Sequence, residues 1–486
     1  MNRFLVVIIV ISFIGSGLLP SSISTFEERT VYTNHKSGGY IQDLIDNANP
    51  GDTIYIPSGI YYENIIINKS ISLIGEDKNT TIIFGSEFES YVIVITANWV
   101  NISEFTIQNS ESGIGSCRDN VTISSNIILD CDIAILSSGC IKNTYFNNYI
   151  SNCDYGILIH PWGSHSSDNS ILNNTFVNIS IWGISIDSSM NNDISYNIFS
   201  NCYNAIQVFG GRYNSISGNI ILNNYKGINM LGYVNNSIIG NTIQYNNYGI
   251  TLSGTDYISV IDNNMSNNNE YGISLIGQQN SLILNNIISM NNKGIILGHS
   301  DENIIINNTI IENDLIGLDI YSSHNNSIKN NNITLNREEG MYLVDSNNNL
   351  IKYNHISYNE DGIELEDSNH NIICNNLINL NNDHGVEIIE SNSGESINNS
   401  IISNIIKSNN NGVYLENASN NTIEKNNFLK NSRHALFKNC TNIWIKNYWN
   451  RPRILPKLIF GRINLEKYSI PWFNIDWRPA LKPYDI

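Results

Sequence analysis

The 486-residue chain has few charged side chains, and basic ones are the scarcer kind. Asp and Glu number 44 and Lys and Arg only 26, which gives a formal net charge of -18 and a pI near 4.8. Nucleic-acid binding needs a basic surface that neutralises phosphates, so this balance argues against it. It suits a soluble acidic surface or the binding of cations. Low charge alone would allow disorder, but 41% of the residues are hydrophobic and recur at regular intervals, which indicates a folded chain.

Long hydrophobic runs are also missing, apart from one at the start of the chain. Residues 4–19 are apolar except for Ser12, Ser16 and two glycines; they follow Arg3 and precede the small residues Ser22-Ile23-Ser24. This pattern predicts a signal peptide over residues 1–24, whereas the alternative, an uncleaved membrane anchor, is disfavoured because the run is short for a span. We therefore expect a secreted or cell-surface protein without a membrane span after signal removal. Its Asn-x-Ser/Thr sequons permit glycosylation.

A repeated sequence motif occupies most of the rest of the chain. A small residue before an apolar pair recurs mostly every 22 or 23 residues, and after Gly249 the apolar residues Ile250 and Leu252 alternate with Thr251 and Ser253. Period 2 indicates strands, and a fixed repeat of this length indicates a solenoid. Three short strands per turn describe an all-β, right-handed parallel β-helix of roughly seventeen coils, about 80 Å long. A leucine-rich repeat is the alternative fold at this period. It needs a Leu-rich consensus, which the recurring Ile and Asn residues of this chain do not supply. The small residues are Gly113, Ala134, Gly156, Gly183, Ala205, Gly227, Gly249, Gly272, Gly294, Gly317, Gly340, Gly362, Gly385, Gly412 and Ala435.

Asparagine recurs in the same register. Because Asn tolerates left-handed backbone and its amide can bond to a neighbour above, we expect a ladder of Asn side chains at a corner of the coils. Eight residues before the small residue stand Asn126, Asn148, Asn197, Asn219, Asn241, Asn264, Asn286, Asn332, Asn354, Asn404 and Asn427.

Both ends of the solenoid need a cap. Residues 41–48 have apolar side chains at i, i+3, i+4 and i+7, which predicts a short amphipathic helix over the first coil. The β-helix with this cap is expected over residues 38–446. Residues 447–486 are rich in Trp and Pro and predict an irregular C-terminal cap; their excess of basic residues also allows a docking surface for a cell-wall polymer or a partner.

The segment IQDLIDNANPGDTIYIPSGIYYENIIINKSISLIGED, followed by coils of the NNxYGI type, resembles secreted right-handed parallel β-helix proteins of the NosD type. These belong to the pectin-lyase-like superfamily, whose repeats are often called carbohydrate-binding and sugar-hydrolase domains. The resemblance implies the fold, but the superfamily contains lyases, hydrolases, epimerases and non-catalytic surface proteins. NosD proteins are linked to copper delivery for nitrous oxide reductase. The sequence disfavours copper, because it contains no Met-x-Met or His-x-His arrangement.

Seven cysteines are present, and two pairs are one coil apart. Coil spacing of about 4.8 Å fits the Cα separation of a disulfide, so we predict the pairs Cys131–Cys153 and Cys117–Cys140. A column of buried thiols is the alternative for the first pair.

The first candidate site surrounds the insertion at residues 160–165. His160 and Asp187 follow their marker glycines by the same four residues, which stacks them on one outward column as a candidate catalytic acid/base pair. Aromatic and polar residues near them could bind a sugar, and the alternative is a long loop held by its Trp. These ligand-binding candidates are Trp162, His165, Trp182, Phe209, Arg212 and Tyr213.

The second candidate site is an acidic face. Asp319, Glu364 and Glu387 stand two residues after their marker glycines and Glu366 stands four after, so all should point outward. Such carboxylates could hold Ca²⁺. The alternative is a solvated acidic surface. Ca²⁺ is thus the one cofactor that the sequence suggests, and copper is disfavoured.

The sequence thus predicts an exported β-helix that binds polysaccharide or another glycan, or forms part of the envelope with other envelope proteins. No complete polygalacturonase or pectate lyase motif is present, so an enzyme (a polysaccharide lyase, hydrolase or uronan epimerase) is the alternative. NosD-like copper delivery is a second alternative.

Overall fold

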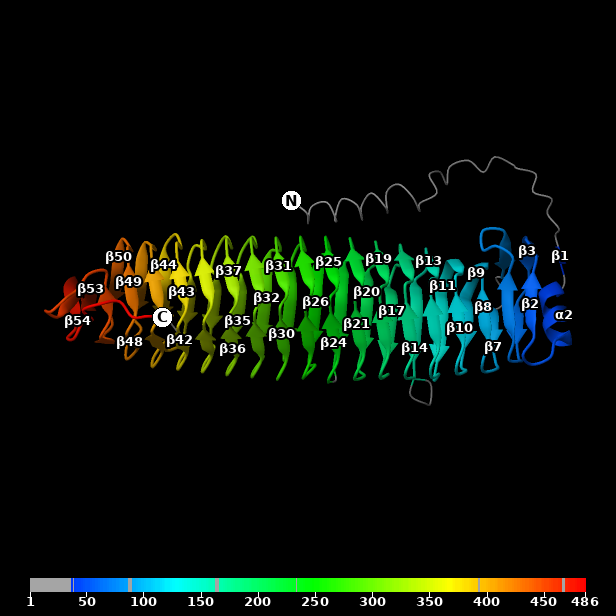
Figure 1. Ribbon diagram of the computed structural model, residues 1–486, viewed down its shortest axis with the longest axis horizontal. Helices are drawn as coiled ribbons and strands as arrows, with labels where there is room; N and C mark the ends of the chain where they lie inside the picture. Colours follow the sequence, from blue (N-terminus) through cyan, green and yellow to red (C-terminus); the bar gives the residue numbers. More distant parts are fainter. Residues whose placement is uncertain are drawn as a thin grey trace, which may run out of the picture.

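The computed structural model describes residues 36–37, 39–85, 90–161, 166–232, 234–391, 394–465 and 468–486. These residues form a long rod of stacked coils, with the N-terminal helix at one end and strands β53 and β54 at the other (Figure 1). The predicted parallel β-helix is confirmed, with about eighteen turns. The predicted signal peptide lies outside the described residues. Within the described part of the chain, no helix is long and apolar enough to cross a membrane.

Parallel pairing between successive coils builds three sheets along the rod. In the first sheet each strand pairs with the strand one coil later, for example Ser237–Ile239 with Ser259–Ile261. Its strands are β2 (Thr53–Ile56), β5 (Ser72–Gly75), β8 (Asn101–Ser103), β10 (Thr122–Ser124), β12 (Thr144–Phe146), β15 (Ser170–Leu172), β18 (Asp193–Ser195), β21 (Ser215–Ser217), β24 (Ser237–Ile239), β27 (Ser259–Ile261), β30 (Leu282–Leu284), β33 (Ile304–Ile306), β36 (Ser327–Lys329), β39 (Leu350–Lys352), β42 (Ile372–Cys374), β45 (Ser400–Ile402), β48 (Thr422–Glu424) and β51 (Ile443–Ile445).

The second sheet is built in the same way, and its two longest strands continue into the third sheet. Its strands are β1 (Lys36–Ser37), β3 (Gly59–Tyr62), β6 (Thr81–Phe84), β9 (Thr106–Ser116), β11 (Ile127–Ser138), β13 (Tyr149–Ser151), β16 (Thr175–Val177), β19 (Ile198–Ser200), β22 (Ile220–Leu222), β25 (Thr242–Gln244), β28 (Asn264–Ser266), β31 (Ile287–Ser289), β34 (Thr309–Ile311), β37 (Asn332–Thr334), β40 (His355–Ser357), β43 (Leu377–Asn379), β46 (Ile405–Lys407), β49 (Asn427–Leu429) and β52 (Tyr448–Trp449).

The third sheet contains the longest strands of most coils and carries the outward residues of both candidate sites. It also includes parts of β9 and β11. Its other strands are β4 (Ile65–Ile67), β7 (Tyr91–Ile95), β14 (Tyr155–His160), β17 (Trp182–Asp187), β20 (Asn204–Phe209), β23 (Lys226–Leu231), β26 (Tyr248–Ser253), β29 (Tyr271–Ile276), β32 (Lys293–Gly298), β35 (Leu318–Tyr321), β38 (Met341–Val344), β41 (Ile363–Glu366), β44 (His384–Ile389), β47 (Asn411–Glu416), β50 (Arg433–Lys438), β53 (Lys457–Leu465) and β54 (Tyr468–Asp476).

The core is a set of aliphatic columns enclosed by the three sheets. Ile250 and Leu252 of β26 are fully buried, and Ile273 and Leu275 of the next coil lie in register with them. Each coil can bury these side chains only against its neighbours, which is why the unit repeats. The marker glycines are small for a steric reason: a Cβ on Gly249 would lie 2.3 Å from the carbonyl oxygen of Gly272.

Ladders of asparagine connect the coils at their corners. The main-chain N–H of Asn219 donates to Oδ1 of Asn241 at 2.9 Å, and Nδ2 of Asn219 donates to the same oxygen at 3.0 Å. Asn241 makes the same pair of bonds with Asn263, both at 2.9 Å. Two further corners carry comparable ladders, for example Asn246 to Asn268 and Asn326 to Asn349.

The predicted ladder is correct in kind but needs two corrections. Asn264, Asn332 and Asn427 begin strands, and the ladder instead contains Asn263, Asn331 and Asn426. In coils of 23 residues, the extra residue lies between the ladder Asn and the marker glycine. Counting eight residues back from the glycine therefore reaches the residue after the ladder Asn. The left-handed backbone belongs to the residue before each ladder Asn, such as Asp262 and Asn285, and the ladder side chains are themselves buried.

The N-terminal cap is helix α2 (Tyr40–Asn47), close to the predicted span. Ile41 and Ile45 are fully buried against the first coils, as the amphipathic pattern predicts. The helix lacks a side-chain cap of its own. Glu63 supplies one by accepting the N–H groups of Ile41 and Gln42 at 3.0–3.2 Å.

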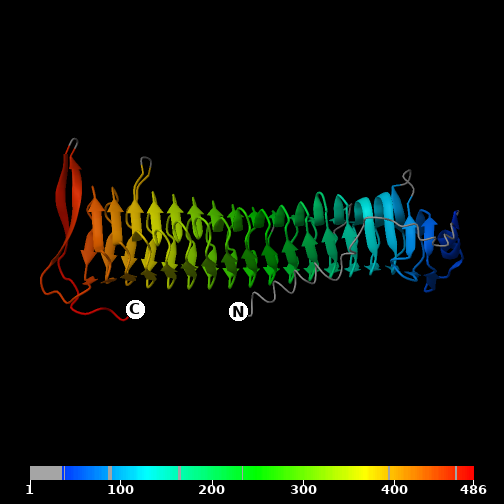
Figure 2. The same cartoon turned by 90° about the horizontal axis from the view of Figure 1, so that it is seen from above.

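The C-terminal cap is more regular than predicted, because β53 and β54 pair as an antiparallel hairpin. Figure 2 shows this hairpin, in red, standing out beyond the side of the rod. Asp476 of β54 closes the first Asn ladder by accepting from the N–H of Asn447 at 2.9 Å and from the Trp449 indole at 3.1 Å. A carboxylate can end the ladder because it accepts bonds without requiring a further acceptor.

The two predicted disulfides are not formed, since all seven cysteines are free. Cys131 and Cys153 occupy one buried corner column, but each Sγ donates to a carbonyl of its own coil, at 3.3 Å to Leu129 and 3.4 Å to Ser151. Cys140 is directed toward Ser137, whereas Cys117 is exposed. One coil of separation therefore satisfies the Cα distance of a disulfide but not the direction of the side chains.

We predict that Asn286→Ala destabilises the rod by at least about 2 kcal/mol, because the carbonyl of Val260 and the N–H of Asn263 both lose a buried partner. Urea unfolding and hydrogen exchange at the Asn263 amide measure the effect. Asn285→Gly is the matched control: Asn285 is exposed and has a positive φ, which Gly accommodates, so its change should stay within about 0.5 kcal/mol. Equal stability of the two variants would contradict a structural role for the ladder.

Candidate functional site

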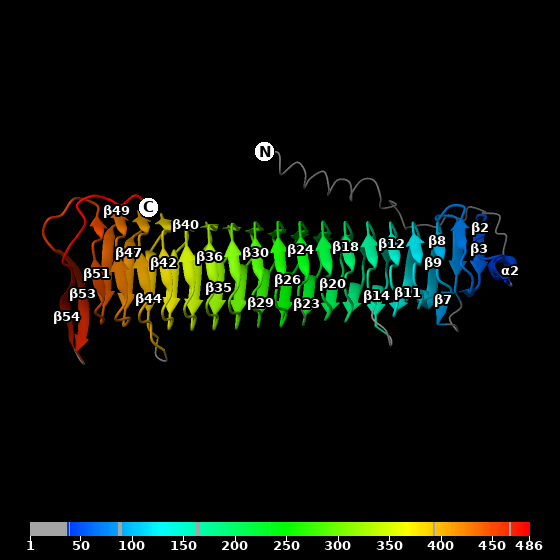
Figure 3. The ribbon, with the colours of Figure 1, turned by 60° about the horizontal axis from the view of Figure 1, so that its bottom comes forward.

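The outward residues of the third sheet form columns that run along the rod, because each coil pairs in register with the next. Figure 3 shows the strands of this sheet side by side from β14 to β47. A middle column therefore passes from neutral residues to an acidic region. Its members are Ser185, Gln207, Asn229, Thr251, Ser274, Ile296, Asp319, Tyr342, Glu364, Glu387 and Tyr414.

Aromatic rings line one edge of the third sheet over successive coils. Tyr203 and Tyr225 stack with ring centroids 4.7 Å apart, and Tyr225 meets Tyr248 edge-on at 5.4 Å. Tyr248 and Tyr271 continue the line at 5.2 Å. In the coils before them, Tyr155 and Trp182 meet edge-on at 5.4 Å. We call this line, Tyr155, Trp182, Tyr203, Tyr225, Tyr248 and Tyr271, the aromatic edge.

The structure brings His160 and Asp187 together as the sequence predicts. Nδ1 of His160 lies 3.3 Å from Oδ2 of Asp187, and both side chains are partly exposed. Their strands, β14 and β17, are adjacent in the third sheet. Trp162 and His165 lie outside the described residues. Arg212 and Tyr213 are not brought to the pair: they are exposed at the corner between β20 and β21.

Trp182 and Phe209 cover a buried polar patch. Their ring centroids are 5.3 Å apart although the two residues belong to opposite ends of β17 and β20, so the rings must meet above the middle column. Beneath them Ser185 and Gln207 are only 1% exposed. Among the described residues, the Ser185 hydroxyl, Gln207 Nε2 and Oδ1 of neighbouring Asn204 have no hydrogen-bond partner. Buried polar atoms without partners are uncommon and costly, which marks this patch as a place where a polar ligand would be stabilised.

The four residues predicted for Ca²⁺ do not converge on one point. Glu364 and Glu387 are neighbours in the middle column. Asp319 lies two coils away from Glu364 and pairs with Lys293 at 2.6 Å. Glu366 is on the next outward column, where the Tyr342 hydroxyl donates to it.

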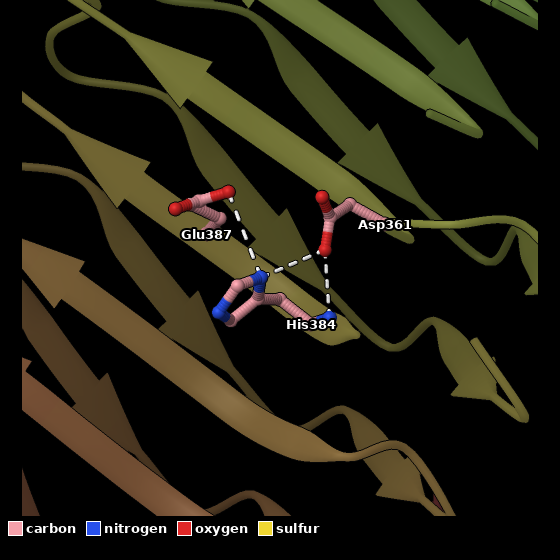
Figure 4. Close-up of side chains that lie close together, drawn as sticks. All are labelled: Asp361, His384 and Glu387. Carbon is pink, nitrogen blue, oxygen red and sulfur yellow. Dashed lines mark hydrogen bonds and ion pairs between the residues drawn. The ribbon is translucent and has the colours of Figure 1, made fainter. Parts of the chain in front are cut away.

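A tighter cluster forms around a histidine that sequence reasoning missed. Nδ1 of His384 lies 2.8 Å from Oδ1 of Asp361 and 3.6 Å from Oε2 of Glu387, and the His384 main-chain N–H also donates to Asp361 at 2.6 Å (Figure 4). All three side chains are less than 15% exposed. The signal that could have found His384 is its position: like Asp361, it directly precedes a marker glycine.

Two overlapping sets of side chains in this cluster could hold a metal ion. The first is Asp361, His384 and Glu387, and the second is Glu339, Asp361 and Glu364. Within each set the ligand atoms lie within 4.8 Å of one another, and Asp361 belongs to both.

Burial and mutual repulsion shift the pKa values of these groups. Burial raises the pKa of Glu364 to about 8, and the charge of Glu387 adds to the shift. Burial also raises the pKa of Glu387 to about 7, although nearby His384 favours the ionised form. Burial is the largest single effect on His384 and opposes its charge. The hydrogen bond to Asp361 and the charges of Glu387, Asp361 and Asp383 together outweigh it, so the pKa of His384 is raised. Glu364 and Glu387 therefore give up their protons with difficulty.

Comparison with protein families assigns the chain to one of them. A family model described as "Periplasmic copper-binding protein (NosD)" matches residues 24–243, 150–271, 203–356, 283–404 and 343–462, which together span most of the chain. The chain belongs to the NosD family. This confirms the resemblance carried by its N-terminal segment and its repeats. No curated protein sequence matches this NosD-family chain.

Three solved structures with other names are similar to this NosD-family chain. DFA-IIIase from Arthrobacter chlorophenolicus A6, in complex with GF2, is 13% identical with a TM-score of 0.43, over 53% of this chain and 84% of that one. Alginate lyase from a Paenibacillus species is 15% identical with a TM-score of 0.37, over 49% and 91%. The mannuronan C-5 epimerase A-module of Azotobacter vinelandii is 13% identical with a TM-score of 0.28, over 81% and 89%. Identities this low concern the fold and carry nothing about activity.

The family description names copper, so the fit of this chain to copper can be judged from its ligands. Cu⁺ selects thiolate and thioether ligands. The corner cysteines do not fit, because burial raises the pKa of Cys131 to about 11 and those of Cys153 and Cys202 to about 12, which keeps the thiols protonated. Among the described residues, the sets around Asp361 offer nitrogen and oxygen donors, which suit a divalent ion instead.

We predict that the protein becomes less stable as pH rises from about 4.5 to about 8. In the folded chain Glu364 and Glu387 stay protonated at pH values above 4.5, the ordinary pKa of Glu. In the unfolded chain they lose these protons at lower pH, so a rise in pH favours the unfolded chain. Thermal unfolding followed by circular dichroism in EDTA measures this. Glu364→Gln should reduce the decrease by about half. Stability that rises over this interval, or a slope that Glu364→Gln leaves unchanged, would contradict the assignment.

Proposed function

We propose that this NosD-family protein works outside the cytoplasm and binds an extended polysaccharide along the outer face of the third sheet. The aromatic edge carries the proposal. Apolar faces of sugar rings pack on aromatic side chains, while hydroxyl groups need polar partners. A line of rings over successive coils, beside a column of polar side chains, supplies both along one straight path.

The edge-on pairs are the best contact points for sugar rings. Trp182 is inclined at 63° to Tyr155 and at 66° to Phe209, and Tyr225 at 88° to Tyr248. An edge-on neighbour covers less of a ring face than a parallel neighbour does, whereas the rings of the stacked pair Tyr203 and Tyr225 cover each other. Trp182 and Tyr248 are therefore the rings that we expect to stack on a sugar.

The polar groups near Trp182 would form hydrogen bonds with the hydroxyl groups of the sugar. The patch under Trp182 and Phe209 contains an amide donor from Gln207, an acceptor from Asn204 and a hydroxyl from Ser185, all without partners in the described part of the chain. The His160 and Asp187 pair borders it. With the two rings turned aside, a sugar hydroxyl, which donates and accepts at once, would satisfy such groups, so this region is the proposed specificity-determining part of the path.

Charge favours a neutral polymer over an acidic one. The chain has a net charge of -18, and the middle column becomes acidic from Asp319 onward. An acidic polysaccharide would meet like charge along this half of the path, at a cost that only bound cations could offset. We therefore expect uncharged glycans to be the better ligands.

We predict that Trp182→Ala and Tyr248→Ala each weaken retention by a neutral polysaccharide at least about tenfold in affinity electrophoresis, because each removes a sugar-stacking face. Tyr353→Asn is the matched control. It removes an exposed ring at the corner between β39 and β40, where Asn tolerates the positive φ, and should leave retention unchanged.

Each variant is checked for unchanged thermal unfolding before retention is compared. Equal losses in the Tyr353 control, or full retention by both variants, would overturn the proposal. Product analysis of retained glycans by mass spectrometry separates binding from turnover. Product that disappears in Asp187→Asn would replace the binding function with an enzymatic one at the His160 pair.

A further inference from the structure

We propose that Asp361, His384 and Glu387 form a binding site for one borderline divalent metal ion, Zn²⁺ or Cu²⁺. The site differs from the predicted Ca²⁺ set, with which it shares only Glu387. It also lies beyond the aromatic edge along the rod, on β41 and β44, so either proposal can fail without the other.

The donor set selects this class of ion. Zn²⁺ and Cu²⁺ bind imidazole nitrogen together with carboxylate oxygen. Ca²⁺ instead takes six to eight oxygen ligands and has no use for the nitrogen. Cu²⁺ binds a given nitrogen and oxygen site more tightly than Zn²⁺ does, so the two ions share the site and availability decides between them.

The three ligands are held by rigid neighbouring elements. Asp361 lies two residues before β41, His384 begins β44, and Glu387 belongs to β44. The two strands pair in register, and the His384 N–H fixes Asp361 at 2.6 Å. Their ligand atoms are already within 4.8 Å of one another, so an ion placed between them needs only side-chain adjustment.

His384 is the point on which the cluster converges. Its Nδ1 has carboxylate oxygens of Asp361, Glu387 and Asp383 at 2.8, 3.6 and 3.7 Å. One proton on this nitrogen can satisfy only one of these oxygens at good hydrogen-bond distance. A divalent ion binding the unprotonated nitrogen can contact Asp361 and Glu387 at the same time.

The surrounding charge also favours a cation. Glu339 and Glu364 complete a second carboxylate set with Asp361, so acidic groups outnumber the one histidine. Two lysines on either side along the sheet already have carboxylate partners: Lys293 pairs with Asp319 and Lys438 with Glu416. A dipositive ion would relieve a repulsion that protonation otherwise has to remove.

Calorimetric titration of the EDTA-treated full chain with Zn²⁺, and separately with Cu²⁺, tests the site. We expect one ion per chain, no displacement by millimolar Ca²⁺, and at least tenfold weaker binding in His384→Ala and in the near-isosteric Glu387→Gln. The Cu²⁺ complex should show coupling to imidazole nitrogen in its electron paramagnetic resonance spectrum, and His384→Ala should abolish that coupling.

Glu366→Gln serves as the control, since Glu366 points outward on the neighbouring column and belongs to neither metal-ligand set. Its metal affinity should equal that of the unchanged chain. Absence of binding, binding that both ligand variants retain, or equal competition by Ca²⁺ would each overturn the proposal. Retention of neutral glycan by the unchanged chain in EDTA is expected to be normal, which separates a failure of the metal site from a failure of glycan binding.

Discussion

Register between coils is the constraint on which the rest of this protein depends. Every strand hydrogen-bonds with the strand one turn later, and the Asn ladders repeat this bonding at the corners, where strand pairing is interrupted. A ladder Asn satisfies a main-chain N–H and a main-chain carbonyl of the coil before it at once. Without it, each corner would bury unsatisfied main-chain groups, which cost more than the net gain of an ordinary hydrogen bond.

The same register converts sequence distance into spatial proximity on the surface. Asp361 and His384 are 23 residues apart, yet they share a hydrogen bond, and Trp182 covers residues contributed by the next coil. The outward side chains of the third sheet therefore change in chemical type along the rod, whereas the backbone repeats from coil to coil. Its first part offers aromatic rings and buried amides, and its later part offers carboxylates and an imidazole. One scaffold can accommodate a neutral ligand and a cation because these regions are separated along its axis.

Much of this could be read from the sequence because the repeat encodes it directly. Ile250 and Leu252 predict an inward column, Ile41 and Ile45 predict a capping helix, and equal spacing predicts the His160 and Asp187 pair. The Asn ladder was displaced by one residue in the longer coils, because the position of an inserted residue within a turn leaves no trace in the period. The disulfide prediction failed for a related reason: spacing gives the separation of Cys131 and Cys153 but not the direction of their thiols.

The sequence by itself determined the architecture, since a period of 22 or 23 residues with Ile in alternate positions can bury its apolar face only by stacking. It also determined which side chains face outward on each strand. Only the tertiary structure decided which of them meet. It placed His384 between Asp361 and Glu387, assigned Asp319 to Lys293, and covered Gln207 with two rings. The physical reason is that side-chain partners depend on rotamers, corner geometry and neighbouring coils, none of which a repeat length specifies.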